Sequence, residues 1–419
     1  MSSSGGVELL APAGSLEKLE QVYRYGADAA YLGVAGLSLR ARAETFDPEA
    51  DTRAVAEAKS RHGAGRRLYG AVNVYVHQAE LPRLEERIEA LGEDHPFDAF
   101  IVSDLGAAAI LRKYHPDAEL HLSTQANCVN AEAVRMYRDL GFSRVVPGRE
   151  LSLREIAEIR RSVPEVELEV FVHGAMCLAY SGRCFLSAWM ADRSGNRGDC
   201  AHSCRWEYRV LEEKKRPGEY YPVFEGEGFT AVMSSKDINM VDHLRELLDA
   251  GVDSLKIEGR MKSSYYAAVV TRAYRKALDA LTGAAAPGRQ GAIDPAPFVA
   301  ELYGVSHRDF TTGFYFGSEE VEKPAEGSYR RSHRFLGIVR EALGDGGFRI
   351  EVKNSIRPGT PIEFIGPDVP VLRDEAFTVT DAEGSATEAA HHGGSYRIYP
   401  SRPVEEGFLI RSSGEEEVW

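Results

Sequence analysis

Short apolar runs alternate with amphipathic segments over the first two-thirds of the chain. This alternation is the pattern of repeated strand–helix units. Seven of the apolar runs predict strands that begin at Glu8, Ala29, Arg67, Ala99, Glu119, Arg144 and Glu167. Two later runs, FTAVMSS from Phe229 and SLKIEG from Ser254, are expected to be the last strands. About eight or nine such units in one chain favour an α/β fold of the (β/α)8, TIM-like barrel type over an open doubly wound sheet.

Local helix signals agree with this alternation. Ser15 precedes the first amphipathic segment at the N-cap position, and Ser152 with Glu155 forms an S-x-x-E capping box. Asp237 is expected to cap a later helix. We therefore predict that the barrel spans residues 7–283.

The last quarter of the chain has a different pattern. A Gly/Ala/Pro-rich stretch within 284–331 predicts a linker or extension. Short alternating runs punctuated by turns such as Gly346-Gly347 then fill residues 332–415. They predict a small all-β C-terminal barrel that holds a partner. No G-x-G-x-x-G or G-x-x-x-x-G-K-[ST] turn follows any strand, so the sequence gives no support to a nucleotide-binding fold.

The chain is acidic as a whole but contains two basic stretches. The 50 Lys and Arg against 64 Asp and Glu give a net charge of −14, which argues against indiscriminate nucleic-acid binding. Between His173 and Arg216, however, there are eight basic and five acidic residues. Arg330, Arg331 and Arg334 form a second basic group. No secretory signal and no run of eighteen apolar residues is evident, so we expect a cytoplasmic protein without a membrane partner.

The cysteines are the most distinctive chemistry in the chain. Four of the five, Cys177, Cys184, Cys200 and Cys204, lie within a predicted insertion over residues 172–228. Because the cytosol keeps thiols reduced, such clustering indicates a metal or cluster site rather than disulfides. The fifth, Cys128, is expected to be a buried core residue.

The residues leave several uses for these thiols open. A structural zinc site usually has two C-x₂-C knuckles, which the spacings here lack. A radical-SAM motif fails because Glu207 occupies its third position. Cys177 could act as a nucleophile with His173 as its base, but three thiols would then have no role. An iron–sulfur cluster uses all four and is favoured, with zinc and a catalytic thiol as alternatives.

Polar residues gather where the predicted strands end. In a barrel of this type the active site lies at the carboxyl ends of the strands. The residues expected there are Asn73, Asp104, Ser123, Gln125, Asn127, Arg149, Glu150, His173, Lys236, Asp237, Glu258, Arg260 and Lys262. Several cations around one mouth suit a small di-anionic substrate or a phosphate backbone.

Three stretches resemble peptidase family U32, the collagenase-like proteins. They are ELLAPAGSLEKLEQVYRYGADAAYLG, FVHGAMCLAYSGRCFLSAWMADRSGNRGDCAHSCRWEY and SSKDINMVDHLRELLDAGVDSLKIEGRMKSSYYAAVVTRAYRKALD. The chain is most similar to the tRNA hydroxylation branch, and sister branches act on ribosomal RNA and on the ubiquinone ring. The resemblance implies formation of 5-hydroxyuridine at the tRNA wobble position without molecular oxygen. Prephenate is implied as the hydroxyl source and an iron–sulfur cluster, of the 4Fe–4S type, as the cofactor.

The same resemblance assigns residues. It implies that Cys177, Cys184, Cys200 and Cys204 bind the cluster. Prephenate is a dicarboxylate, so the cations expected to bind it are Arg149, Arg183, Lys236 and Arg260. His173 and Glu258 are the acid/base candidates, because ring hydroxylation must also move protons. The basic groups and the β module are expected to hold tRNA.

Other classes of function stay open at this point. The family name implies a peptidase, which needs a nucleophile–base pair that works without iron. A hydroxylase of another substrate, such as ribosomal RNA or a quinone ring, is a second alternative, and a non-catalytic RNA-binding scaffold is a third. The sequence also leaves open whether a partner protein or a second copy of the chain takes part.

Overall fold

Eight parallel strands close into a barrel in the part of the chain that the structure describes. The computed structural model describes residues 6–34, 37–38, 46–63, 65–177, 179–184, 186–191, 193, 200–201, 203, 224–226, 229–231, 235–283, 294–317 and 330–414. The barrel strands are β1 (Glu8–Pro12), β2 (Ala29–Gly33), β3 (Arg67–Val72), β4 (Ala99–Val102), β5 (Glu119–Leu122), β6 (Arg144–Val145), β7 (Glu167–Ala175) and β11 (Ser254–Ile257). They pair in chain order, and β11 pairs with both β7 and β1, which closes the ring. The predicted TIM-like barrel is thus confirmed.

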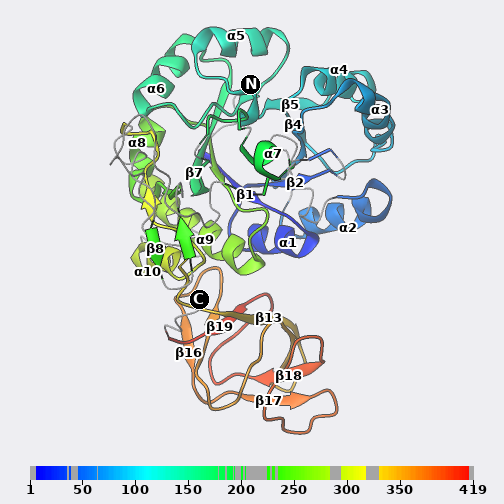
Figure 1. Ribbon diagram of the computed structural model, residues 1–419. Coiled ribbons are helices and arrows are strands. Elements are labelled where there is room, and N and C mark those ends of the chain that lie inside the picture. Colours follow the sequence, from blue (N-terminus) through cyan, green and yellow to red (C-terminus); the bar gives the residue numbers. More distant parts are fainter. Residues whose placement is uncertain are drawn as a thin grey trace.

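Helices cover the outside of the ring (Figure 1). They are α1 (Leu16–Arg24), α2 (Pro48–Arg61), α3 (Leu81–Glu89), α4 (Leu105–Tyr114), α5 (Ala131–Asp139), α6 (Leu153–Ser162), α8 (Leu244–Asp249) and α9 (Ser264–Thr282), with short 3₁₀ turns η1 (Gln78–Glu80), η2 (Thr124–Ala126) and η5 (Val241–His243). The predicted caps are present: the Ser15 side chain accepts from the amide of Lys18, and Ser152 and Glu155 form a capping box. These caps satisfy amides that the first helical turn leaves unpaired.

Two expectations about the region before β11 were wrong. The run from Phe229 is not a barrel strand: β9 (Phe229–Ala231) pairs with β8 (Phe224–Gly226) in a separate two-stranded sheet. Asp237 does not cap a helix. It begins β10 (Asp237–Asn239), which runs antiparallel against the end of β7. The Asp237 carboxylate accepts from the Arg308 Nη2 at 2.6 Å, and both side chains are buried.

Apolar residues alternate between the two faces of the barrel wall. Leu9, Ala11, Ala30 and Leu32 belong to the large core between strands and helices. Their neighbours point into the barrel, where a smaller cluster forms from Leu10, Ala29, Tyr31, Tyr69, Ala99 and Ile101. The period of two that makes a strand amphipathic therefore separates an outer and an inner core.

The barrel interior also contains a buried ionic network. The Lys256 Nζ lies 2.7 Å from Glu169 Oε1, and the Arg144 Nη1 lies 3.1 Å from Glu169 Oε2 and 2.6 Å from Glu8 Oε1. Glu169 is fully buried. Burial by itself raises the pKa of Glu169, but the charges of Lys256 and Arg144 outweigh it and lower that pKa to about 2. The network is therefore ionised at neutral pH.

The C-terminal residues form a curled antiparallel sheet with its own core. Its strands are β13 (Phe335–Ala342), β14 (Phe348–Val352), β15 (Ile362–Ile365), β16 (Leu372–Asp374), β17 (Thr378–Asp381), β18 (Tyr396–Tyr399) and β19 (Leu409–Ser412), in the order β16-β15-β19-β13-β14-β18-β17. The sheet docks on α1 and α9 (Figure 1), where the Tyr25 hydroxyl donates to the Ile365 carbonyl and Arg272 to that of Gly366.

A short extension precedes this sheet. It comprises α10 (Ala296–Val299), η6 (Ala300–Tyr303) and β12 (Phe310–Thr311), and β12 pairs with β10 in parallel. Thus the extension adds to the barrel sheet beyond β10. Among the helices described, none has the length and apolar character needed to cross a membrane.

Candidate active site at the barrel mouth

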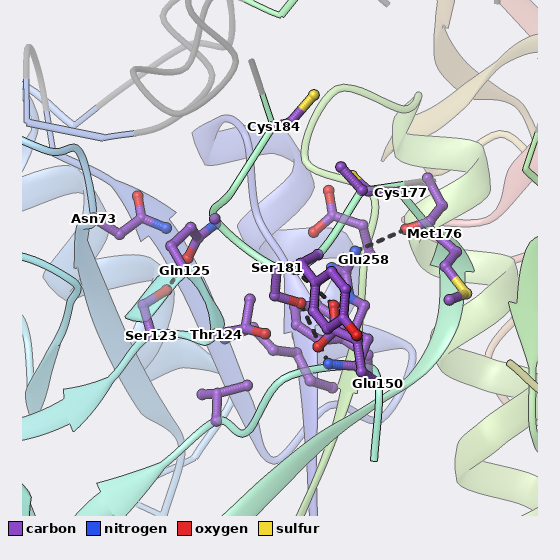
Figure 2. Close-up of a pocket in the computed structure, with 18 of the residues that line it drawn as sticks. Asn73, Ser123, Thr124, Gln125, Glu150, Met176, Cys177, Ser181, Cys184 and Glu258 are labelled. Carbon is purple, nitrogen blue, oxygen red and sulfur yellow. Dashed lines mark hydrogen bonds between the residues drawn. The ribbon is translucent and has the colours of Figure 1, made fainter. Parts of the chain in front are cut away.

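A cavity of about 430 Å³ opens at the carboxyl ends of the barrel strands. Pockets that hold small molecules typically measure about 300–1,000 Å³. Its wall includes residues that follow β3, β5, β6, β7 and β11, and the polar and sulfur-bearing members are Tyr31, Asn73, Ser123, Thr124, Gln125, Arg149, Glu150, Met176, Cys177, Tyr180, Ser181, Cys184, Cys200, Lys256, Glu258 and Arg260. In the view of Figure 2, Cys177 and Cys184 lie above Ser123 and Thr124. The predicted location of the site is therefore where the cavity lies.

Three of the four clustered thiols line this cavity: Cys177, Cys184 and Cys200. None of the three is in a disulfide. The backbone beside Cys177 is fixed because the Ser235 hydroxyl donates to the Met176 carbonyl at 2.6 Å. Cys204 lies outside the described residues.

The short helix α7 (Leu186–Ala191) holds the backbone next to Cys200. The Ser187 hydroxyl accepts from the Ala201 amide at 2.8 Å and donates to the Arg193 carbonyl at 2.6 Å. Figure 1 shows α7 across the open end of the barrel. These bonds bring Cys200 to the cavity that Cys177 and Cys184 also line.

A turn between the first two cysteines is locked to the barrel. The Ser181 amide donates to Glu150 Oε1 at 2.6 Å, and the Ser181 hydroxyl accepts from the Arg149 amide at 3.3 Å. Gly182 has φ +69° and sits directly against the Gln125 carbonyl, so a side chain there would collide with backbone. The turn is thus fixed to the ends of β5 and β6.

Three cations line the cavity: Arg149 from the loop after β6, Lys256 from β11, and Arg260 from the loop after β11. Arg149 stacks on Phe171 with its guanidinium 3.9 Å from the ring centroid. Its Nη1 donates to the Ala175 carbonyl, while its Nε is buried without a hydrogen-bond partner among the described residues. Arg260 packs against Gly33 and donates to the Ser38 hydroxyl at 2.6 Å. Lys256 lies 4.6 Å from the Tyr31 ring. Arg149 and Arg260 thus bring positive charge to the cavity wall, whereas Lys256 shares its charge with the buried Glu169.

Glu258 is the carboxylate beside this cationic wall. The Tyr31 hydroxyl lies 3.3 Å from Glu258 Oε2, and the Tyr266 hydroxyl donates to the Glu258 carbonyl. The Glu258 amide donates to the His173 carbonyl at 2.8 Å. The backbone of Glu258 is thereby fixed while its side chain lines the cavity.

Three of the predicted acid/base and substrate-binding residues do not line the cavity. His173 lies inside β7 and is 1% exposed, with Tyr274 and Phe310 packed against its ring. Burial lowers the pKa of His173 to about 3, so the imidazole is neutral at physiological pH. Arg183 is exposed and Lys236 directly precedes β10, and neither is among the residues that line the cavity.

The remaining strand-end residues have structural contacts. Asp104 caps α4 by accepting from the amides of Gly106 and Ala107. Asn127 adopts the left-handed backbone (φ 52°) and donates to Glu150 at 3.5 Å. Lys262 donates to the Ser306 carbonyl at 3.0 Å.

The thiol chemistry fits a sulfur-ligated centre, but the described residues do not complete one. No three His, Cys, Asp or Glu side chains in the described ranges stand close enough to hold a metal ion. Three cysteine side chains outside disulfides on one cavity wall are nonetheless the donor type that iron–sulfur clusters use. The fifth cysteine, Cys128, is 2% exposed in the core as expected, and burial raises its pKa to about 11.

Lys256 and Tyr180 are among the wall residues that were not identified from the sequence. Lys256 alternates with Leu255 and Ile257 in its strand, and this alternation could have placed it inside the barrel. Tyr180 has no such periodicity, since it lies in a turn. Its position on the wall follows from the Glu150–Ser181 contact, which no local pattern reveals.

Comparisons with known proteins agree with this architecture. The family model described as "Peptidase family U32" matches residues 14–324, and that of the "Peptidase family U32 C-terminal domain" matches residues 331–411. The chain is 37% identical to "tRNA hydroxylation protein P" of Escherichia coli (strain K12), over 91% of this chain and 90% of that one.

Two further relatives carry different names. "tRNA hydroxylation protein P1" of Bacillus subtilis (strain 168) is 35% identical over 96% of this chain and 94% of its own length. "Collagenase" of Porphyromonas gingivalis (strain ATCC BAA-308 / W83) is 32% identical over 87% and 88%.

Proposed function

Because the chain belongs to peptidase family U32, we propose that it is an enzyme that hydroxylates tRNA. The finer proposal is formation of 5-hydroxyuridine at the wobble position without molecular oxygen, with prephenate as the hydroxyl source. The observation that carries it is the cavity wall, where three thiols and three cations meet at the barrel mouth. The relatives named for tRNA hydroxylation support the RNA class of substrate.

The proposed cofactor is an iron–sulfur cluster of the 4Fe–4S type. Cys177, Cys184, Cys200 and Cys204 would hold it, and the Ser181–Gly182 turn and α7 would fix the backbone around three of them. When bound, such a cluster supplies electron transfer. When the hydroxyl arrives at the oxidation level of hydroxide, replacing C5–H of uridine by C5–OH releases one proton and two electrons. The site therefore needs a proton acceptor, and the two electrons would pass through the cluster to an external electron acceptor.

The chain's own residues supply the other parts of the proposed site. Arg149, Arg260 and Lys256 form the wall that would bind a dicarboxylate by charge-assisted hydrogen bonds. Glu258 is the proposed proton acceptor because it lines the cavity, whereas buried His173 is weakly basic. We propose that His173 positions Glu258 through their backbone hydrogen bond. Arg183, Lys236 and the basic residues Arg330, Arg331 and Arg334 are proposed contacts to RNA phosphates.

One reconstitution tests this function. Protein purified and loaded with iron and sulfide under anaerobic conditions is incubated with unmodified tRNA and a chemical electron acceptor, with and without prephenate. Nucleosides are then analysed by mass spectrometry, with ribosomal RNA as a parallel substrate. We expect 5-hydroxyuridine in tRNA only when prephenate is present. Product in ribosomal RNA alone would contradict the tRNA assignment, and product without prephenate would contradict the hydroxyl source.

The peptidase alternative has less support from the site. It needs a thiol and a base in contact, but the His173 ring packs on Tyr274 and Phe310, and Cys177 lies on the cavity wall without a described contact to that ring. A cluster-free preparation that cleaves gelatin and loses this activity in the Cys177→Ala variant would favour the peptidase.

Arg149 gives the sharpest test of dicarboxylate binding. We expect Arg149→Ala to raise the KM for prephenate about 10- to 150-fold, because a hydrogen bond to a charged group contributes roughly 1.5–3 kcal/mol. Arg149→Lys should recover part of this loss, since it restores charge without the planar fork. The measurement is initial rate against prephenate concentration in the reconstituted reaction.

A neighbouring arginine provides the control for this prediction. Arg154 is on α6 with a side chain that is 87% exposed, so Arg154→Ala should leave the KM for prephenate unchanged. An equal KM in the Arg149→Ala variant and the wild type would remove Arg149 from the proposed binding wall.

A further inference from the structure

Tyr180 combines an exposed ring with a fixed backbone. Its side chain is 66% exposed and lies on the cavity wall between Cys177 and Cys184 in the chain. No aromatic or cation–π contact joins the ring to another described residue. Packing therefore gives no reason for a large aromatic side chain at this position.

The backbone around Tyr180 is held on both sides. The Tyr180 carbonyl accepts from the Arg183 amide at 3.0 Å, and the next amide, that of Ser181, donates to Glu150. Gly182 then sits against the Gln125 carbonyl. Because the backbone is already fixed, only the two side-chain torsions of Tyr180 lose freedom when it binds a ligand, which favours a role in recognition.

The other aromatic residues of the described wall have different surroundings. Tyr31 and Phe171 are buried, and they stack against Lys256 and Arg149 respectively. Phe314 is half-buried. Tyr180 thus offers the most exposed aromatic ring of this wall.

The proposed reaction requires such a surface. Chemistry on a ring carbon needs the whole base to leave its stack and enter the site. Proteins that bind unstacked RNA bases place them on aromatic side chains, where the flat ring replaces the lost neighbour.

We propose that Tyr180 stacks on the target pyrimidine of the RNA at the mouth of the cavity. This inference rests on the proposed function, since it concerns the same site. It makes Tyr180 a substrate-binding residue that acts on RNA affinity and leaves the thiol-bound centre unaffected.

A photo-crosslinking experiment tests the contact directly. An RNA hairpin with 5-iodouridine at the target position is irradiated with the cluster-loaded protein under anaerobic conditions, and the linked peptide is identified by mass spectrometry. We expect the linkage at Tyr180. It should persist in Tyr180→Trp, which keeps a stacking face, and disappear in Tyr180→Ala.

Kinetics separate stacking from a structural role. Tyr180→Ala should raise the KM for tRNA roughly 5- to 150-fold, which corresponds to the about 1–3 kcal/mol of a base–aromatic stack. Its visible cluster spectrum and KM for prephenate should match the wild type, and Tyr180→Trp should restore the KM for tRNA. Tyr303→Ala, which removes a tyrosine that is 58% exposed outside the cavity wall, serves as the control and should have no effect.

The outcomes distinguish this inference from the proposed function. If wild-type protein hydroxylates tRNA while Tyr180→Ala has an unchanged KM for tRNA, the stacking role alone is wrong. A lost cluster spectrum in Tyr180→Ala would also overturn it, because the residue would then support the thiols. If wild-type protein modifies no RNA under any condition, the proposed function fails and the stacking role fails with it.

Discussion

Replacing Cys200 with alanine is expected to abolish both the visible absorbance of the anaerobically purified protein and its hydroxylation of tRNA. Cys200 lines the cavity with Cys177 and Cys184, and its removal would take one thiolate from the proposed cluster. The side chain is half-buried, so truncation costs little packing. Loss of activity would therefore reflect lost ligation rather than unfolding. The measurements are the visible spectrum, iron content, and wobble 5-hydroxyuridine in a deletion strain complemented with the variant.

The chain contains a matched control for this substitution. Cys128 is buried in the core, and burial raises its pKa, which makes the thiol a poor ligand. Cys128→Ala should therefore retain colour and hydroxylation and lose only packing stability. A Cys200→Ala protein that keeps normal hydroxylation would contradict the cluster proposal. Zinc rather than iron in the wild-type protein would contradict it as well.

The second large effect is expected from Glu169. Glu169→Ala would leave Lys256 and Arg144 buried without their shared carboxylate. Removing one partner of a buried ion pair destabilises proteins by about 3–5 kcal/mol, because the remaining charge keeps its desolvation cost. We expect a loss of this size in the free energy of unfolding, measured by urea denaturation of the cluster-free protein and followed by circular dichroism.

The effect should depend on pH in a defined direction. The pKa of Glu169 is about 2 in the folded protein, below the ordinary value of 4.5. A lowered pKa means that ionised Glu169 stabilises the fold above pH 4.5, and that this contribution is lost as pH falls from 4.5 towards 2. The stability difference between wild type and Glu169→Ala should shrink over that interval.

An exposed ion pair sets the baseline for comparison. Glu158 pairs with Arg154 on α6, where the two side chains are 50% and 87% exposed. Glu158→Ala should change the free energy of unfolding by no more than about 0.5 kcal/mol, since water screens such a pair. If Glu169→Ala were equally mild, the interior network would not be stabilising the barrel.

The barrel was predictable because each of its strands is either apolar on both faces or alternates between apolar and polar residues. The runs from Glu8 to Glu167 all became barrel strands. The run from Phe229 has the same local character, but β9 pairs with β8 instead. Strand propensity does not specify which strand a segment pairs with, so this error could not be detected from the run itself.

The sequence predicted those site residues that lie in the loops after predicted barrel strands. Glu258 directly follows β11, and Arg260 and Arg149 lie in the loops after β11 and β6, so all three reached the cavity. His173 did not, because β7 continues to Ala175 and pairs there with β10. The strand that makes this antiparallel pairing lies about 60 residues further along the chain. The residues next to His173 therefore contain no pattern that predicts it.

The pairing of β1 with β11 has a consequence for synthesis of the chain. Glu8 accepts from the Ser254 hydroxyl, 246 residues away in sequence. During synthesis, one edge of β1 therefore stays unpaired until β11 has left the ribosome. Contacts between residues so distant in sequence also form slowly. Cys177, Cys184 and Cys200 precede β11, so they leave the ribosome before the ring can close. Between these two events the three thiols have left the ribosome while the barrel is still open. The proposed cluster could therefore be inserted before the ring closes.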